Sequence, residues 1–98
     1  MKQPSECRSL EEVRAEIDRI DEQVIALLGE RAHYVKAAAR FKASEAAVAA
    51  PERLAAMLQA RRSWAETHGL NAAVIEKMYR DLVDYFIAWE KEHWKAGN

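Results

Sequence analysis

Four cations in this 98-residue chain could act on a small negatively charged molecule: Arg14, Arg31, Lys42 and Arg53. Arg31 falls on the apolar side of a helical pattern, and Arg14 flanks the same side. Lys42 and Arg53 lie on either side of the alanine-rich stretch 43–50. An arginine on an apolar face is usually a side chain that reaches out to water or a member of a buried ion pair. Cations around an apolar space walled by helices would instead suit a small dianion.

One carboxylate, Glu90, also stands among apolar residues. Its neighbours at helical spacing are Val83, Phe86 and Trp94. A glutamate in such surroundings is paired with a cation, kept neutral by burial, or placed at a fraying helix end. The spacing leaves all three interpretations open.

Other kinds of chemistry lack the residues that they need. His33, His68 and His93 do not have the spacing of metal ligands, and the single Cys7 gives neither a zinc site nor an internal disulfide. The sequence has no glycine-rich phosphate loop and no nucleophile elbow. We therefore expect no metal and no cofactor.

Composition narrows the class of protein further. A formal net charge of −1 argues against a nucleic-acid partner. No apolar run approaches the roughly 20 residues that span a bilayer, and the N-terminal segment MKQPSECRSL lacks the apolar core of a signal peptide. A lone cysteine fits a reducing compartment. We expect a single cytoplasmic domain over residues 1–98, with no membrane partner.

Helices would have to position these candidate residues. The first is predicted over residues 10–41, because apolar residues alternate at spacings of three and four. Ser9 and Glu12 have the spacing of a capping box at its start. The apolar residues of this stripe are Leu10, Val13, Ile17, Ile20, Val24 and Leu27.

Two further helices are predicted. Pro51 suits the first turn of a second helix, which His68 and Gly69 would end. Asn71 can cap a third helix, and no alternating strand pattern occurs. The sequence therefore predicts an all-α fold of three helices, with a first helix much longer than the others.

The length of the first helix indicates an assembly. About 31 residues at 1.5 Å each give about 46 Å, whereas a compact domain of about 100 residues has a radius of gyration of about 13 Å. Such a helix needs a partner surface beyond its own chain, so we expect a homodimer.

The segment VRAEIDRIDEQVIALLGER, residues 13–31, resembles the signature of the all-helical chorismate mutase family: an arginine, an I-D-x-I-D pattern, and an apolar run that ends at a second arginine. With Lys42, Arg53 and the three-helix pattern, the resemblance covers nearly the whole chain. Within that family, YVKAAARFKASEAA (34–47) and PERLAAML (51–58) are similar to the isochorismate-pyruvate lyases that make salicylate for siderophores.

The resemblance implies an intertwined homodimer with two sites, each lined by both chains. Arg14 matches an arginine that reaches into the partner's site, and Arg31 one that grips a substrate carboxylate. Lys42 matches a lysine on a mobile lid, near the ether oxygen of the bond that breaks, and Arg53 a cation at the start of the second helix. The implied apolar walls are Val35, Ala38, Met57 and Ile87. Arg14 and Arg31 lie about 25 Å apart along one helix, which is too far for both to bind one ten-carbon ligand. If both serve one site, the two arginines must come from different chains.

The chain departs from the mutase pattern at two positions and from the lyase pattern at one. Where mutases are expected to carry an aspartate and a glutamate around the second-helix arginine, this chain has Ala50 and Leu54, which favours the lyase. Where the lyases are expected to carry a glutamine, it has Glu90. Glutamine donates a hydrogen bond at any pH, whereas glutamate donates only when protonated. We hypothesise that Glu90 is a catalytic residue that is neutral in a dianion-filled apolar pocket, which would shift the rate optimum towards acid.

The activity that the resemblance implies is the concerted elimination of pyruvate from isochorismate, which leaves salicylate and is accompanied by weak chorismate mutase activity. Chorismate mutase as the main activity is an alternative. A non-catalytic helical dimer that binds partner helices is another, although such a surface has no need for four cations around one cavity.

Overall fold

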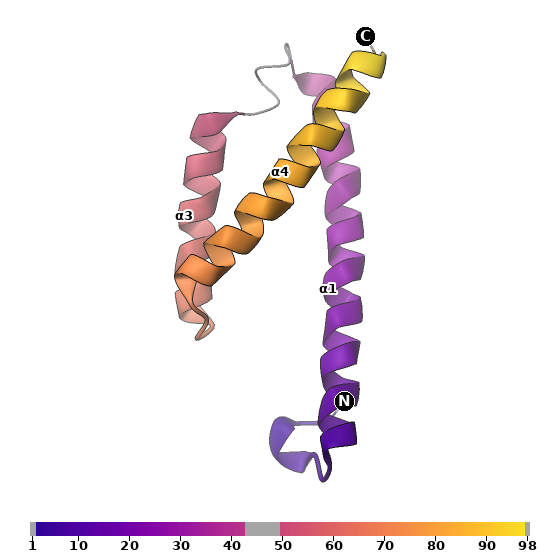
Figure 1. Ribbon diagram of the computed structural model, residues 1–98, viewed down its shortest axis with the longest axis vertical. Coiled ribbons are helices and arrows are strands. Elements are labelled where there is room, and N and C mark those ends of the chain that lie inside the picture. Colours follow the sequence, from indigo (N-terminus) through magenta and orange to yellow (C-terminus); the bar gives the residue numbers. More distant parts are fainter. Residues whose placement is uncertain (1, 43–49, 98) are drawn as a thin grey trace. The chain divides into compact units, whose positions relative to one another are not determined.

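The computed structural model describes residues 2–42 and 50–97, with side chains as far as residue 92 (Figure 1). Its elements in chain order are η1 (Pro4–Glu6), α1 (Leu10–Ala38), η2 (Ala39–Phe41), α3 (Pro51–Thr67) and α4 (Ala72–Gly97). No strand occurs among the described residues, so the prediction of an all-α fold with three helices is confirmed. The expectation that the first helix is much longer than the others is wrong. α4 has 26 residues and α1 has 29, because no stop signal follows the apolar stripe of α4 before Gly97.

The chain divides into two compact units, residues 1–34 and 35–98, and each is described by itself. The single domain over residues 1–98 stays a prediction. Within the described parts of the chain, no helix is long and apolar enough to cross a membrane.

The N-terminal unit holds η1 and most of α1. The Ser9 side chain caps α1, because its Oγ atom accepts a hydrogen bond from the Glu12 N–H at 3.1 Å. The other half of the predicted capping box differs, since Glu12 Oε1 accepts from the Arg8 N–H at 3.2 Å. Glu12 also pairs with Lys2, which draws its carboxylate towards the segment before the helix. The hydrogen bond between these two side chains is the main reason that the pKa of Lys2 is raised and the pKa of Glu12 is lowered.

The predicted apolar stripe of α1 is exposed in the single chain. Its side chains are between 39% exposed (Val13) and 61% exposed (Leu10 and Leu27). Aliphatic side chains on one face of a long helix at this exposure leave a large apolar surface in water, and such surfaces mark sites of association.

The C-terminal unit begins with the last turn of α1 and with η2. The predicted helix end at residue 41 is nearly correct, because α1 ends at Ala38 and residues 39–41 continue as a 3₁₀ turn. The Lys42 N–H closes this turn on the Ala39 carbonyl at 3.3 Å. The lid is predicted over residues 42–50, and all of it except Lys42 and Ala50 lies outside the described residues.

α3 begins where the sequence predicts, with Pro51 in its first turn. The residue before it, Ala50, has φ 38° and ψ 65°, a left-handed conformation that disfavours side chains with a Cβ atom. At the other end, Gly69 takes φ 74°, and the Leu70 N–H donates to the Ala65 carbonyl at 2.8 Å. This arrangement confirms the predicted glycine stop.

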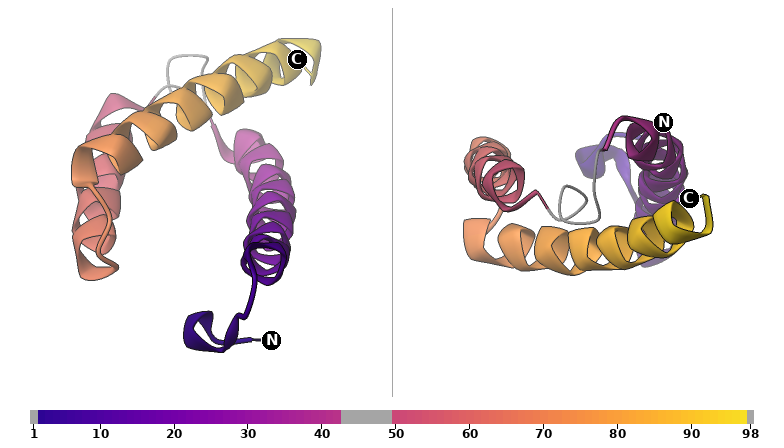
Figure 2. Two further views of the ribbon diagram at one scale, coloured as in Figure 1. Left: turned by 60° about the horizontal axis from the view of Figure 1, so that its bottom comes forward. Right: turned by 90° about the horizontal axis from the view of Figure 1, so that it is seen from above.

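α3 and α4 form a helical hairpin that contains the hydrophobic core (Figures 1 and 2). Met57 and Leu58 of α3 pack with Val83 of α4, and these three side chains are at most 9% exposed. The partly buried residues that pack against this cluster are Leu54, Tyr79 and Ile87. These contacts fix the position of α4 along α3.

Polar contacts tie the hairpin near its turn. Asn71 Oδ1 accepts a hydrogen bond from the Val74 N–H at 3.0 Å, which confirms the predicted cap of α4. Glu76 binds two arginines, Arg80 on its own helix and Arg62 on α3, each at 2.9 Å. The hydrogen bonds from Arg80 and then from Arg62 hold the pKa of the Glu76 carboxyl below its ordinary value.

Candidate active site

Two predicted catalytic residues, Lys42 and Glu90, lie together in the C-terminal unit. Lys42 follows η2 directly, and Glu90 lies near the C-terminal end of α4. The distance from Lys42 Nζ to Glu90 Oε2 is 3.0 Å, with side chains 24% and 4% exposed. Of the three interpretations of Glu90 left open by the sequence, pairing with a cation is the one that the structure shows. The fraying helix end is wrong, because Glu90 is among the most buried residues described.

The Lys42–Glu90 contact is electrostatic and lacks the angles of a hydrogen bond. Glu90 Oε2 is buried without a hydrogen-bond partner, although Lys42 Nζ lies within ion-pair distance. A buried carboxylate normally gathers several donors. This oxygen is therefore held by the charge of Lys42, and it remains able to accept a hydrogen bond.

Apolar residues surround this part of the hairpin. Phe86, one turn before Glu90 on α4, is 8% exposed, and Ile87 packs against the core cluster of the hairpin. Of the predicted apolar walls, Met57 is 5% exposed and belongs to that cluster. Val35 and Ala38 are half-buried at the end of α1. Their role as walls of a substrate pocket stays a prediction.

The predicted substrate-binding arginines lie on three different turns of helix. Arg53 is exposed in the first turn of α3. Arg14 is exposed and Arg31 is half-buried, and both lie on α1 in the N-terminal unit. One helix carries Arg14 and Arg31 about 25 Å apart, so a single chain does not bring these two together. The convergence of all four cations on one cavity stays a prediction.

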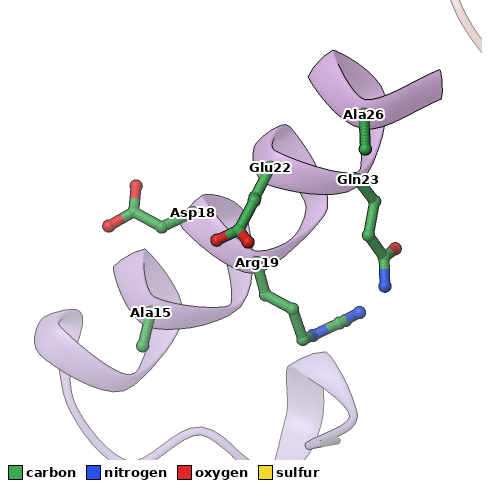
Figure 3. A pocket seen from close by; sticks show the side chains of 6 residues that line it. All are labelled: Ala15, Asp18, Arg19, Glu22, Gln23 and Ala26. Carbon is green, nitrogen blue, oxygen red and sulfur yellow. The ribbon is translucent and has the colours of Figure 1, made fainter. Parts of the chain in front are cut away.

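A surface hollow of about 560 Å³ lies elsewhere, along α1 (Figure 3). The residues that line it are Ala15, Asp18, Arg19, Glu22, Gln23 and Ala26. None of them is a predicted site residue. Its lining carries the carboxylates of Asp18 and Glu22 and a single cation, Arg19, which is already paired with Glu16 at 3.0 Å. The charge of this lining makes the hollow unsuitable for a dianion.

Sequence reasoning gave no role to the half-buried Arg61 of α3. Its guanidinium carbon lies 4.8 Å from the ring centre of Trp64 and 5.4 Å from that of Tyr79. Trp64 is one turn away, which was a usable signal, whereas the approach of Tyr79 requires the hairpin. Of the other aromatic residues of α4, Tyr79 packs against the core and Trp89 is half-buried. The side chain of Trp94 lies outside the described residues.

The described side chains contain no group of three or more residues that could hold a metal ion. What the C-terminal unit offers is an ammonium group next to a buried carboxylate, on a framework of apolar helices. Fixed positive charge in such surroundings can stabilise an anion that forms as a bond breaks. The fold defines a class of small all-helical proteins, and the part of the candidate site that the structure brings together is Lys42 beside the buried Glu90.

Comparison with known proteins gives the family. Residues 13–91 match the family described as chorismate mutase type II, and the chain belongs to that family. The resemblance inferred from residues 13–31 is thereby confirmed.

Two relatives refine this result. The chain is 48% identical over 95 residues to the isochorismate pyruvate lyase of Pseudomonas aeruginosa, covering 97% of this chain and 94% of that protein. It is also 40% identical over 73 residues to the T-protein of Haemophilus influenzae, covering 74% of this chain and 19% of that protein. The similarity to the lyase therefore spans both chains almost completely, whereas the similarity to the T-protein is confined to a small part of it.

Proposed function

We propose that this protein is an isochorismate-pyruvate lyase that converts isochorismate into salicylate and pyruvate. The observation that carries this proposal is the 48% identity to an isochorismate pyruvate lyase over nearly the full length of both chains. The Lys42 ammonium beside the buried Glu90 supplies the charge that the chemistry requires.

The proposed reaction is concerted. The bond between the ring carbon and the ether oxygen breaks, a hydrogen atom moves from the ring to the enolpyruvyl methylene, and the ether oxygen becomes the carbonyl oxygen of pyruvate. No nucleophile, metal or general base is needed. The protein contributes by holding a compact reactive conformer and by placing the Lys42 charge where the ether oxygen gains electron density.

We further propose that the site is completed in a homodimer. The exposed apolar stripe of α1, with Ile17 at 49% and Ile20 at 48% exposure, supports pairing of this helix with a second copy. The partner's Arg14 would enter the site in which Arg31 grips a carboxylate and Arg53 supplies a further cation. A cytoplasmic location is proposed from the lone Cys7, which fits a reducing compartment.

The experiment that tests the proposal gives the purified protein isochorismate and chorismate in separate assays. We expect salicylate fluorescence from isochorismate and slow formation of prephenate from chorismate. Efficient prephenate formation without salicylate would establish a mutase instead. If neither product forms, the enzymatic proposal fails.

The role of Lys42 has its own pair of variants. Lys42→Ala should lower kcat far more than Lys42→Arg, because arginine keeps a positive charge near the ether oxygen. Equal losses would indicate that shape rather than charge matters, and undiminished salicylate formation by Lys42→Ala would exclude a catalytic role.

Chorismate mutase as the main activity is the second candidate, and the match to the chorismate mutase type II family favours it. The same compact conformer and the same cations would serve that rearrangement. A non-catalytic helix-binding dimer is a weaker alternative. Thermal shift separates it, because salicylate or pyruvate should stabilise an enzyme and leave a scaffold unchanged.

A further inference from the structure

We infer that Arg40 is a positioning residue for Lys42. Its side chain holds the 3₁₀ turn η2, and this turn fixes the backbone from which the Lys42 side chain extends. Arg40 itself binds the main chain and an aromatic ring rather than the substrate. The inference rests on the proposed function, because it concerns the placement of the cation that the elimination requires.

Lys42 needs a firm backbone if its charge is to be placed accurately. A lysine carries its charge at the end of a flexible four-carbon chain. Glu90 holds the tip of that chain, with Lys42 Nζ 3.0 Å from Glu90 Oε2. The backbone of Lys42 is extended, with φ −95° and ψ 128°, and its N–H closes η2 on the Ala39 carbonyl at 3.3 Å. Because a displacement of about 1 Å can cost about 100-fold in rate, loosening of this turn should slow the reaction.

The Arg40 side chain contacts the chain on both sides of its own position. Its Nε atom donates a hydrogen bond to the Ala37 carbonyl at 3.4 Å. Its guanidinium carbon lies 5.3 Å from the ring centre of Phe41. The last four carbonyls of a helix lack partners within the helix, and a cation near that end interacts favourably with the helix dipole. One side chain thus joins the end of α1 to the residue directly before Lys42.

Exposure supports this interpretation of the contact between Arg40 and Phe41. Phe41 is 81% exposed, and Arg40 is exposed as well. A ring at this exposure contributes little through burial, whereas a cation above its face is attracted to it even at an exposed site. The two neighbouring cations therefore differ in their contacts, since Lys42 faces the buried Glu90.

Steady-state kinetics with isochorismate test the inference. Arg40→Ala should lower kcat about fivefold, the effect of one exposed cation–ring contact and one weak hydrogen bond, and should leave KM nearly unchanged. Phe41→Leu should lower kcat similarly, because it removes the ring. Phe41→Tyr keeps the ring and should retain the wild-type kcat. Both positions are exposed, so these changes should leave the fold intact, which melting curves check.

A second comparison asks whether Arg40 acts through Lys42. In a Lys42→Ala background, the further change Arg40→Ala should alter kcat by less than about twofold, because the charge that Arg40 positions is already absent. If Lys42→Ala forms no measurable salicylate, the two Phe41 variants decide the question.

Lys36→Ala is the matched control for charge. Lys36 is an exposed cation in the last turn of α1, four residues before Arg40. Its removal should leave kcat unchanged. If Arg40 merely attracted the dianion through long-range charge, Lys36→Ala and Arg40→Ala would raise KM alike and leave kcat unchanged, which would overturn the inference.

The remaining outcomes separate the inference from the proposed function. If the wild type forms salicylate and Arg40→Ala keeps its kcat, the inference is wrong and the lyase stands. Equal kcat values for Phe41→Leu and Phe41→Tyr, or a full fivefold further loss from Arg40→Ala in the Lys42→Ala background, would also overturn the inference alone. If the wild type forms no salicylate, the proposed function fails and the inference fails with it.

Discussion

Removal of Lys42 should destabilise the fold more than removal of the charge on its partner Glu90. At the observed distance of 3.0 Å, two unit charges attract each other by about 5 kcal/mol at an effective dielectric constant of about 20. Burial of the carboxylate offsets much of this attraction. Loss of one partner from a buried pair costs about 3–5 kcal/mol, and the 24% exposure of the Lys42 side chain places the expected cost of Lys42→Ala at about 3 kcal/mol.

A double-mutant cycle isolates the pair. Glu90→Gln leaves a partly solvated ammonium and a neutral amide of the same size, so its expected cost is about 1 kcal/mol. The double variant no longer contains an unpaired buried charge, and we expect it to cost about 2 kcal/mol. The coupling energy of the cycle is then about 2 kcal/mol, within the range measured for residues in contact.

The free energy of unfolding of the wild type, the two single variants and the double variant is measured by urea unfolding at pH 7. All must be compared at one protein concentration, since association of the chains would add to the apparent stability. If the two single costs add up in the double variant to within about 0.5 kcal/mol, the pair does not exist in solution and the reasoning is refuted.

Three further predictions concern the hairpin. Because its arginine partners lower the pKa of Glu76 in the folded state, Glu76 stabilises the fold above its ordinary value of 4.5 and loses this contribution as the pH falls through the lowered value. The difference in melting temperature between the wild type and Glu76→Gln should therefore shrink on acidification, and a difference that grows would contradict the assignment. Met57→Ala should destabilise the protein by about 2–5 kcal/mol, measured by urea unfolding, because this side chain is 5% exposed in the core; a loss below about 1 kcal/mol would show that the core is not built around it. Asn71→Ala should cost about 1 kcal/mol through the lost cap of α4, seen as a lower melting temperature, whereas an unchanged value would mean that the cap is not formed.

The helix boundaries were predictable because their signals are local. Pro51, Gly69 and Asn71 each act on backbone within a few residues of themselves, through a fixed φ angle, a tolerated left-handed conformation and a capping oxygen. The true length of α4 was not predictable from the apolar stripe, since its last turns are polar. The left-handed conformation of Ala50 was not predictable either, because alanine gives no sign of it.

The candidate site could likewise be predicted only in part. The sequence identified Lys42 and Glu90 separately, by residue type and by apolar surroundings. Their contact at 3.0 Å depends on how the chain returns along α4 and has no local signal. The proposed role of Arg14 has no local signal either, because the sequence pattern of one chain does not show where a residue lies in a partner's site.

The left-handed backbone conformation at Ala50 is unfavourable for alanine. Aspartate and asparagine adopt left-handed conformations several-fold more readily than other residues with a Cβ atom, and aspartate is the residue that we expect at this position in mutases. Ala50, at φ 38°, therefore carries a conformational cost that the mutase residue would reduce. If the lyase arose from a mutase ancestor, selection for the new activity fixed alanine here against the preference of the main chain, and reversion at this one position would be favoured by stability whenever that selection relaxed.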